Sequence, residues 1–249
     1  MHNDISILAN LDVNIPIFRY MSFEKFAYLI LEKRLWFTRC DNLGDRHEGS
    51  LPKKIVEERN ARLDNEILED PSKYEEIQKV KRIFERGSCL SRLEKFASCW
   101  TFNDPESLLM WKLYTTNSSG IAIESSVSRI CNCFVRKPND FFERHEMTIA
   151  NTIYEDFIGL DNIERDPVFY KRHAYKYENE IRAFAVFRST VETLDHLSLP
   201  IVLEELINRI YVYSSSDSKP LKNLAEDLIV KCKIEKEVLI PRFDIDVLW

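Results

Sequence analysis

The sequence predicts an α+β fold with a single domain over residues 1–249. The sheet is expected to be mostly antiparallel, either continuous or split, with helices inserted between its strands and flanking it. Three observations predict it. Short apolar stretches of strand length alternate irregularly with helical patterns, without internal repeats. The chain has only 5 glycines and no GxGxxG or P-loop pattern, which argues against glycine-cradled nucleotide folds. Hydrophobic residues make up 45% and charged residues 31%, as in ordinary globular proteins.

The chain opens as strand, helix and strand. Residues 15–21 (IPIFRYM) have the length and apolar content of a buried strand. Ser22 then caps a helix over residues 22–34, whose apolar residues recur at helical spacing. Residues 35–40 (LWFTRC) predict the next strand, and a polar loop over residues 41–54 follows it.

A charge-rich insertion over about residues 53–87 follows the loop. Its apolar positions are scattered, and Asp70-Pro71 interrupts it once. Aspartate is a preferred helix cap and proline fits the first helical turn. We therefore expect two surface helices, the second of which begins at this break.

The middle of the chain predicts further strands around a short helix. Strands are expected over residues 96–102 and 118–125, with a helix over residues 107–114 between them. Residues 129–137 and 147–159 supply more strands around a polar connector.

The last part of the chain alternates helix and strand. A helix over residues 166–176 leads into a strand over residues 176–184. A strand over residues 208–214 follows, then a helix over residues 219–233 with a basic last turn, and a closing strand over residues 236–245.

Charge and cysteine content exclude several classes of function. The net charge of −6 argues against a surface for duplex DNA, but a small anionic ligand can still be held by a few local basic groups. None of the 6 cysteines forms a CxxC, and Cys131 and Cys133 are most simply two positions of one strand, so no metal is expected.

The sequence contains neither a recognisable signal peptide nor a membrane-spanning segment. Its N-terminus lacks the basic and apolar regions of a signal peptide, and no apolar stretch approaches the roughly 20 residues that span a bilayer. We expect a cytoplasmic protein with free thiols and no membrane partner.

The stretch KYENEIRAF, residues 176–184, places unusual polar residues within an apolar run. In a strand, alternate side chains share a face, so Glu178, Glu180 and Arg182 would lie side by side. The plain interpretation is a surface ladder of ion pairs, which contributes little to stability. The other interpretation is a functional site.

Aromatic and basic residues elsewhere could complete such a site. Arg19 and Tyr20 end the first strand, and Trp100 lies in the strand 96–102. Trp111 and Tyr114 share one side of the following helix. Side chains with that spacing more often pack in a core than bind a ligand.

The order of these segments resembles a bacterial family catalogued as domain of unknown function 2971. The resemblance covers residues 18–240, and its specific parts are MWKLYTTNSSGIAI and YENEIR. The chain departs from the family pattern at Gly44 and Arg46, where asparagine and proline are usual, and at Tyr175, where tryptophan is usual. Asp45 and Glu48 of the same pattern are present.

A more distant likeness is to ADP-ribosyltransferases, which bind NAD in a cleft of a split antiparallel sheet without Rossmann glycines. The likeness implies NAD as a substrate. It implies that Glu180 stabilises an oxocarbenium-like ribose and that Glu178 orients or deprotonates the acceptor. The acceptor (protein, nucleic acid or small molecule) and the biological role, toxin and phage-defence roles included, stay open.

The same likeness assigns the NAD-binding residues. Arg19 and Tyr20 would hold phosphate or ribose, and Trp111 or Tyr114 would stack on nicotinamide. Arg182 is added to this group because it shares the strand face with the glutamates.

Two other hypotheses stay open. A metal-dependent hydrolase or nuclease could use Asp45, Glu48, Glu178 and Glu180 as oxygen ligands for Mg²⁺, although Arg182 beside them argues against it. A non-catalytic module could instead pair Glu178 and Glu180 with internal cations such as Arg19, Lys171 or Arg182. The transferase requires an open cleft beside the carboxylates, whereas the structural network requires carboxylates paired with protein cations and no cavity.

Overall fold

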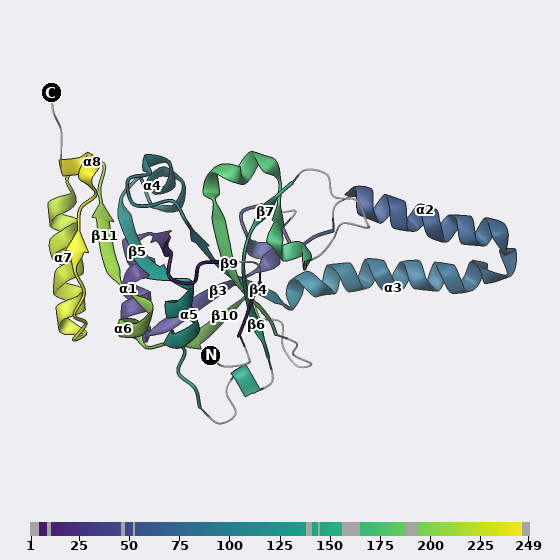
Figure 1. Ribbon diagram of the computed structural model, residues 1–249, viewed down its shortest axis with the longest axis horizontal. Helices are drawn as coiled ribbons and strands as arrows, with labels where there is room; N and C mark the ends of the chain where they lie inside the picture. Colours follow the sequence, from purple (N-terminus) through teal and green to yellow (C-terminus); the bar gives the residue numbers. More distant parts are fainter. Residues whose placement is uncertain are drawn as a thin grey trace.

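A ten-stranded mixed sheet forms the centre of the molecule, and helices flank it (Figure 1). The computed structural model describes residues 5–8, 11–45, 48–51, 53–137, 141–143, 145–155, 165–187 and 194–245. Along the sheet the strand order is β1-β6-β9-β4-β2-β5-β11-β12, with β3 beside β4 and β10 beside β3. Its inner pairings are antiparallel, and the parallel pairs β1–β6 and β11–β12 lie at its two ends. The predicted α+β class is confirmed.

The strands of the sheet are β1 (Ile5–Ile7), β2 (Pro16–Met21), β3 (Arg34–Arg39), β4 (Lys95–Thr101), β5 (Gly120–Ser126), β6 (Met147–Asn151), β9 (Glu180–Val186), β10 (His196–Pro200), β11 (Arg209–Tyr213) and β12 (Val238–Leu239). A separate pair joins β7 (Ile153–Tyr154) to β8 (Tyr170–Lys171). The α-helices are α1 (Phe23–Glu32), α2 (Lys53–Glu69), α3 (Tyr74–Leu93), α4 (Leu108–Tyr114), α5 (Val127–Cys133), α6 (Leu203–Leu206), α7 (Ser218–Lys231) and α8 (Arg242–Ile245). None of the helices in the described ranges is both long enough and apolar enough to cross a membrane.

The sheet is split along one edge of β4. Strands β2 and β3 both run antiparallel to β4, so they are parallel to each other. In register, β2 meets β4 at Thr101, whereas β3 meets it at Phe96 and Ala97. Within the described ladder, the segment 98–100 of β4 therefore pairs with neither strand on this edge. A gap between two strands of one sheet gives a ligand access to side chains from both.

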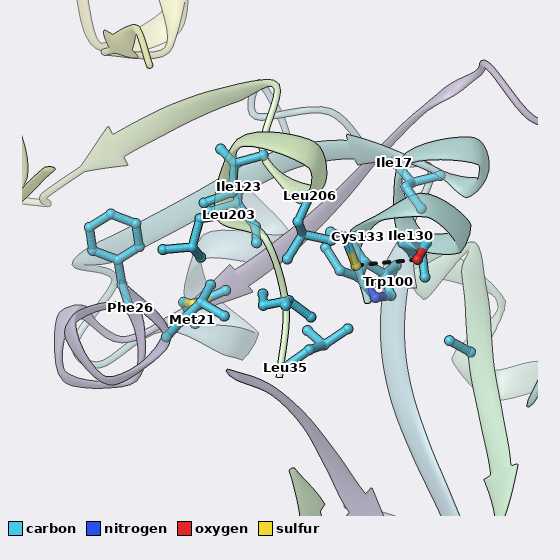
Figure 2. Packing of buried hydrophobic residues seen from close by; sticks show 14 of the residues in the cluster. Ile17, Met21, Phe26, Leu35, Trp100, Ile123, Ile130, Cys133, Leu203 and Leu206 are labelled. Atoms are coloured by element: carbon cyan, nitrogen blue, oxygen red, sulfur yellow. Dashed lines mark hydrogen bonds between the residues drawn. The ribbon is translucent and has the colours of Figure 1, made fainter. Parts of the chain in front are cut away.

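Helix α1 joins the two sides of this split. Ser22 accepts a hydrogen bond from the amide of Lys25, and Lys33 ends the helix in the left-handed conformation with φ 52°. The buried face of the helix includes Phe26, which lies in the core near Met21 of β2 (Figure 2). The predicted strand, helix and strand at the start of the chain are confirmed.

Helices α2 and α3 form a hairpin that projects from the body (Figure 1). Asp70 caps the turn between them by accepting from the amide of Ser72 at 3.1 Å. Asp64 on α2 forms an ion pair with Lys81 on α3 at 2.6 Å, so the helices are antiparallel. The predicted helical insertion with a break at Asp70-Pro71 is confirmed, and its second helix continues to residue 93.

The strand predicted over residues 129–137 is wrong. The segment 127–133 is helix α5, capped by Ser126, which accepts from the amide of Arg129. Its buried residues, Val127, Ile130 and Cys133, recur every three positions and pack on the sheet, and Cys133 donates to the carbonyl of Ile130 at 3.2 Å (Figure 2). The cap and the three-residue spacing decide the structure over the strand preference of Ile130.

The C-terminal half holds further corrections. The helix predicted over residues 166–176 is wrong, because short 3-10 turns (167–169 and 173–178) flank β8 there. The closing strand is reduced to β12, and helix α8 follows it. Strand β10 lies in the segment before residue 208 that the sequence indicates as extended, whereas β1, at the N-terminal end, has no counterpart among the predicted strands. Arg46, His47 and residues 156–159 lie outside the described residues.

Candidate functional site

A cavity of about 600 Å³ lies at the split of the sheet. Its lining comes from β2, α1, β3, β4, α4, β8, β9 and the turn before β9, so it draws on segments far apart in the chain. This volume is in the range of cavities that bind small molecules and cofactors. Glu178, Glu180, Arg19, Tyr20 and Tyr114, all predicted as site residues, line it.

A lysine lies at the centre of a carboxylate cluster on one wall. The ammonium group of Lys171 is 2.9 Å from Glu48 Oε1 and 3.4 Å from Glu180 Oε2, and it donates a short hydrogen bond to Glu178. All four side chains are buried. Three carboxylates thus share one buried cation on the cavity wall.

Arg182 supports this cluster from inside the protein. Its guanidinium donates to both oxygens of Glu180, at 3.1 and 2.8 Å, and to Glu48 Oε2 at 2.9 Å. A further bond goes to the carbonyl of Val168 at 2.6 Å. The side chain is fully buried and does not line the cavity. Its predicted role in holding a cofactor therefore has no support, and Arg182 is a buried counter-ion instead.

A turn brings Glu178 and Glu180 together, rather than the predicted alternation along one strand. Glu178 lies in the 3-10 turn before β9 rather than on the strand, and Asn179 reverses the backbone with φ 45°. Asparagine adopts this left-handed conformation more readily than most residues. Glu180 then begins β9, and its amide donates to the hydroxyl of Tyr154 at 2.7 Å. Both carboxylates reach Lys171, although strand alternation does not place them.

The pKa values of these two carboxyl groups move in opposite directions. Burial raises the pKa of Glu178 above its usual 4.5, and Lys171 offsets this only in part. Burial also acts to raise the pKa of Glu180, but Arg182 and Lys171 outweigh it and lower this pKa to about 2. Two carboxyl groups on one cation with separated pKa values are typical of acid–base and electrostatic roles divided between neighbours.

Tyr114 and Cys99 complete this wall. The side chain of Tyr114 on α4 forms a hydrogen bond with Glu178, and the thiol of Cys99 forms one with Glu180. Burial, followed by the nearby glutamates, raises the pKa of both groups, so both keep their protons. Tyr114 is 41% exposed and faces the cavity.

The lining of the cavity also includes arginines with neutral partners. Arg19 Nη1 donates to Ser98 Oγ at 2.6 Å and to the carbonyl of Trp36 at 3.2 Å, so it bridges the split between β4 and β3. Burial lowers the pKa of Arg19. Arg34 lines the same cavity and donates to Ser198 Oγ at 2.8 Å. A partly buried guanidinium with neutral acceptors is suited to an anionic ligand.

Of the remaining predicted aromatic residues, Tyr20 lines the cavity and Trp111 packs against Tyr20 from the interior. Trp111 is fully buried, its indole donates to the carbonyl of Pro105 at 2.8 Å, and it does not line the cavity. Tyr20 packs edge-on against Trp111 with ring centroids 4.9 Å apart, and its hydroxyl donates to the carbonyl of Asp104. The hydroxyl of Tyr20 is thus hydrogen-bonded to the backbone. Of the two residues predicted to stack on nicotinamide, Tyr114 lines the cavity and Trp111 does not.

Sequence reasoning missed several lining residues. Arg34, Trp36 and Tyr28 line the cavity from α1 and β3. Their positions in the sequence carry no functional pattern, because the site exists only where β2 and β3 separate. The aromatic content of LWFTRC was the one available signal, and it equally indicates a core strand.

The geometry of the site meets some requirements of the structural-network and transferase hypotheses and fewer of those of the metal enzyme. Each carboxylate of the cluster contacts a protein cation, as the structural network requires, but a cavity lies beside them, as the transferase requires. Among the residues that the structure describes, no group of His, Cys, Asp and Glu has the geometry to hold a metal ion, and Asp45 bonds to Arg172 at 3.0 Å. Comparison of the chain with protein-family models, with curated proteins and with solved structures found no match.

Proposed function

We propose that the cavity binds NAD and that the chain is an ADP-ribosyltransferase-like enzyme, which cleaves the bond between nicotinamide and ribose. One observation carries the proposal: the cavity at the split in the sheet is lined both by Arg19 and by Glu178 with Glu180. A diphosphate needs cations, and a ribose that develops positive charge needs a carboxylate nearby. The likeness of the sequence to ADP-ribosyltransferases supports the same assignment.

The proposed reaction develops positive charge on the ribose, and Glu180 is placed to stabilise it. The C1′–N bond breaks, its electron pair leaves with nicotinamide, and the ribose becomes oxocarbenium-like. Glu180, with a pKa of about 2, is ionised at neutral pH and stabilises that cation. Arg182 donates hydrogen bonds to both oxygens of Glu180, which fixes the orientation of the carboxylate but weakens its electrostatic effect on the ribose.

Glu178 serves the acceptor in this scheme. The acceptor's nucleophilic atom bonds to C1′ and gives its proton to Glu178, whose raised pKa makes it the better base of the two. Tyr114 donates to Glu178 and holds it toward the cavity, while its ring offers a surface for nicotinamide. The acceptor is not specified by this geometry.

Calorimetric NAD binding and a nicotinamide-release assay test the proposal on wild type, Glu178→Gln and Glu180→Gln. We expect all three to bind NAD, with release by Glu180→Gln reduced about 10²- to 10³-fold. The matched control is Glu124→Gln. Glu124 is a buried glutamate that accepts from Tyr211 at 3.0 Å and does not line the cavity. It should leave binding and release unchanged.

One observation favours a second function, that of a non-catalytic module. Both oxygens of Glu180 are already bonded to Arg182, as in a non-catalytic module whose ion network fixes the fold. If folded wild type binds no NAD, the transferase proposal fails and this second function stands. We further propose membership of the family called domain of unknown function 2971 and a cytoplasmic location, the latter supported by the free thiols of the described cysteines.

A further inference from the structure

The hairpin of α2 and α3 is too thin to bury its own apolar residues. Its helices have 17 and 20 residues, so each is about 25–30 Å long. Among the side chains described in the hairpin, Ile55 and Ile77 are the buried apolar ones. Leu68 is 80% exposed and Ile83 is 60% exposed. Helices of this length gain most of their stability from packing, and exposed apolar residues along them indicate a contact surface.

One exposed face of α3 carries charges of opposite sign at its two ends, with Ile83 among the basic residues. This outer face consists of Glu75, Glu76, Lys79, Arg82, Ile83 and Arg86, which recur at three- and four-residue spacing and are exposed. The same spacing turns it away from Ile77, which is buried. The face is acidic toward the tip of the hairpin and basic toward the body.

The whole hairpin repeats this polarity. The tip, residues 64–76, is acidic through Asp64, Glu66, Glu69, Asp70, Glu75 and Glu76, with one lysine, Lys73. Nearer the body, α3 carries Lys79, Lys81, Arg82 and Arg86 against Glu85, and α2 begins with Lys53 and Lys54. A rod that is acidic at one end and basic at the other is complementary to an antiparallel copy of itself.

We propose that the hairpin is a homodimerisation element, whose occupant is the hairpin of a second copy of this chain in antiparallel orientation. A two-fold axis near Lys79 places the acidic tip of each hairpin beside the basic part of the other, with Glu76 of one α3 level with Arg82 of the second copy. The four helices then form a bundle that covers the outer faces. The overall charge of −6 opposes contact between the bodies, which the projecting hairpins keep apart.

Sedimentation velocity of the full chain and of two charge-reversal variants tests this. The tip variant changes Glu69, Glu75 and Glu76 to Lys, and the base variant changes Lys79, Arg82 and Arg86 to Glu. Both keep residues of high helix propensity, and far-ultraviolet circular dichroism checks the fold. Wild type should dimerise over about 5–200 μM and weaken more than about tenfold from low to high salt.

Each charge variant alone should be monomeric, because the outer face of its α3 then carries one sign throughout, whereas an equimolar mixture should form a heterodimer. The substitutions Lys219→Glu and Lys231→Glu on α7 are the matched control and should leave the dimer intact. A wild type that stays monomeric, a dimer insensitive to both reversals, or a mixture that does not associate would each overturn the proposal.

Discussion

Glu180 and Glu178 contact the same lysine, but their effects on folding should depend on pH in opposite ways. The pKa of Glu180 is lowered from 4.5 to about 2, so this residue stabilises the fold above pH 4.5 and loses that effect as pH falls toward 2. The shift corresponds to about 3 kcal/mol at neutral pH. The pKa of Glu178 is raised, so its stabilising contribution is present below pH 4.5 and is lost as pH rises through the raised value.

We therefore predict that Glu180→Gln lowers the free energy of unfolding by about 3 kcal/mol at pH 7 and by much less near pH 3. Glu178→Gln should cost little at pH 7 or increase stability, because it removes a carboxylate that burial disfavours. Urea unfolding of both variants at pH 7, 5 and 3 measures this. Equal losses for the two variants at pH 7 would contradict the opposite pKa directions.

Arg182 gives the sharpest test of the buried ion network. We predict that Arg182→Met lowers the free energy of unfolding by about 3–5 kcal/mol, because Glu180 and Glu48 then lose a buried cation. Chemical denaturation at neutral pH measures the loss. The combination with Glu180→Gln should restore part of it, since one uncompensated charge is removed as well. A purely additive double variant would show that the two side chains do not act as a network.

Among the elements, the connection from α4 to β5 shows how a local sequence fixes the position of Tyr114. Asn117 and Ser118 both have positive φ, as in a type I′ turn, and Ser119 donates back to the carbonyl of Thr116 at 2.9 Å. Gly120 follows, and a Cβ built on it would lie 2.7 Å from Cγ2 of Thr115 and would collide with the carbonyl of Met21. This close approach locks α4 to β2 beside the cavity.

Gly120→Ala should therefore destabilise the protein by about 1–3 kcal/mol, because backbone must move to admit the methyl group. Gly87→Ala is the matched control. Gly87 lies in α3 with nothing within 4 Å of its Cβ position, so alanine there should stabilise the helix by about 1 kcal/mol. Thermal unfolding of the two variants measures both effects. A neutral Gly120→Ala would show that the contact with Met21 relaxes without cost.

The elements also show what local patterns can predict. Periodicity and caps predicted α1 and most sheet strands, because their burial follows the sequence period, and the charge-rich composition with the Asp70-Pro71 break predicted the α2–α3 hairpin. They failed at α5, where a serine cap outweighs strand preference, and at residues 166–176, where β8 pairs with β7. The latter pairing is non-local and leaves no signal in the segment itself.

In the whole molecule, the site was predictable only in part. Glu178, Glu180, Arg19, Tyr20 and Tyr114 all line the cavity. Trp111 and Arg182 were assigned to a ligand but lie in the interior, because residue order does not reveal which face of a helix or strand borders a cavity. The contributions of α1 and β3 depend on the separation of β2 from β3, which is a property of the sheet and of no single segment.

Removal of the hairpin tip should separate the function proposed for the body from the dimerisation proposed for the hairpin. Replacing residues 63–82 with a short Gly-Ser turn removes the tip but keeps the cation–π contact of Arg59 with Phe84, 4.6 Å, and the lower part of both helices. Because the cavity lies in the body, we predict that the shortened chain keeps its NAD affinity and nicotinamide release within about threefold and loses its dimer. Calorimetry and sedimentation velocity measure these quantities on one preparation. Loss of nicotinamide release with the dimer would mean that the second copy contributes to the site, whereas an intact dimer would move the interface from the hairpin to the body.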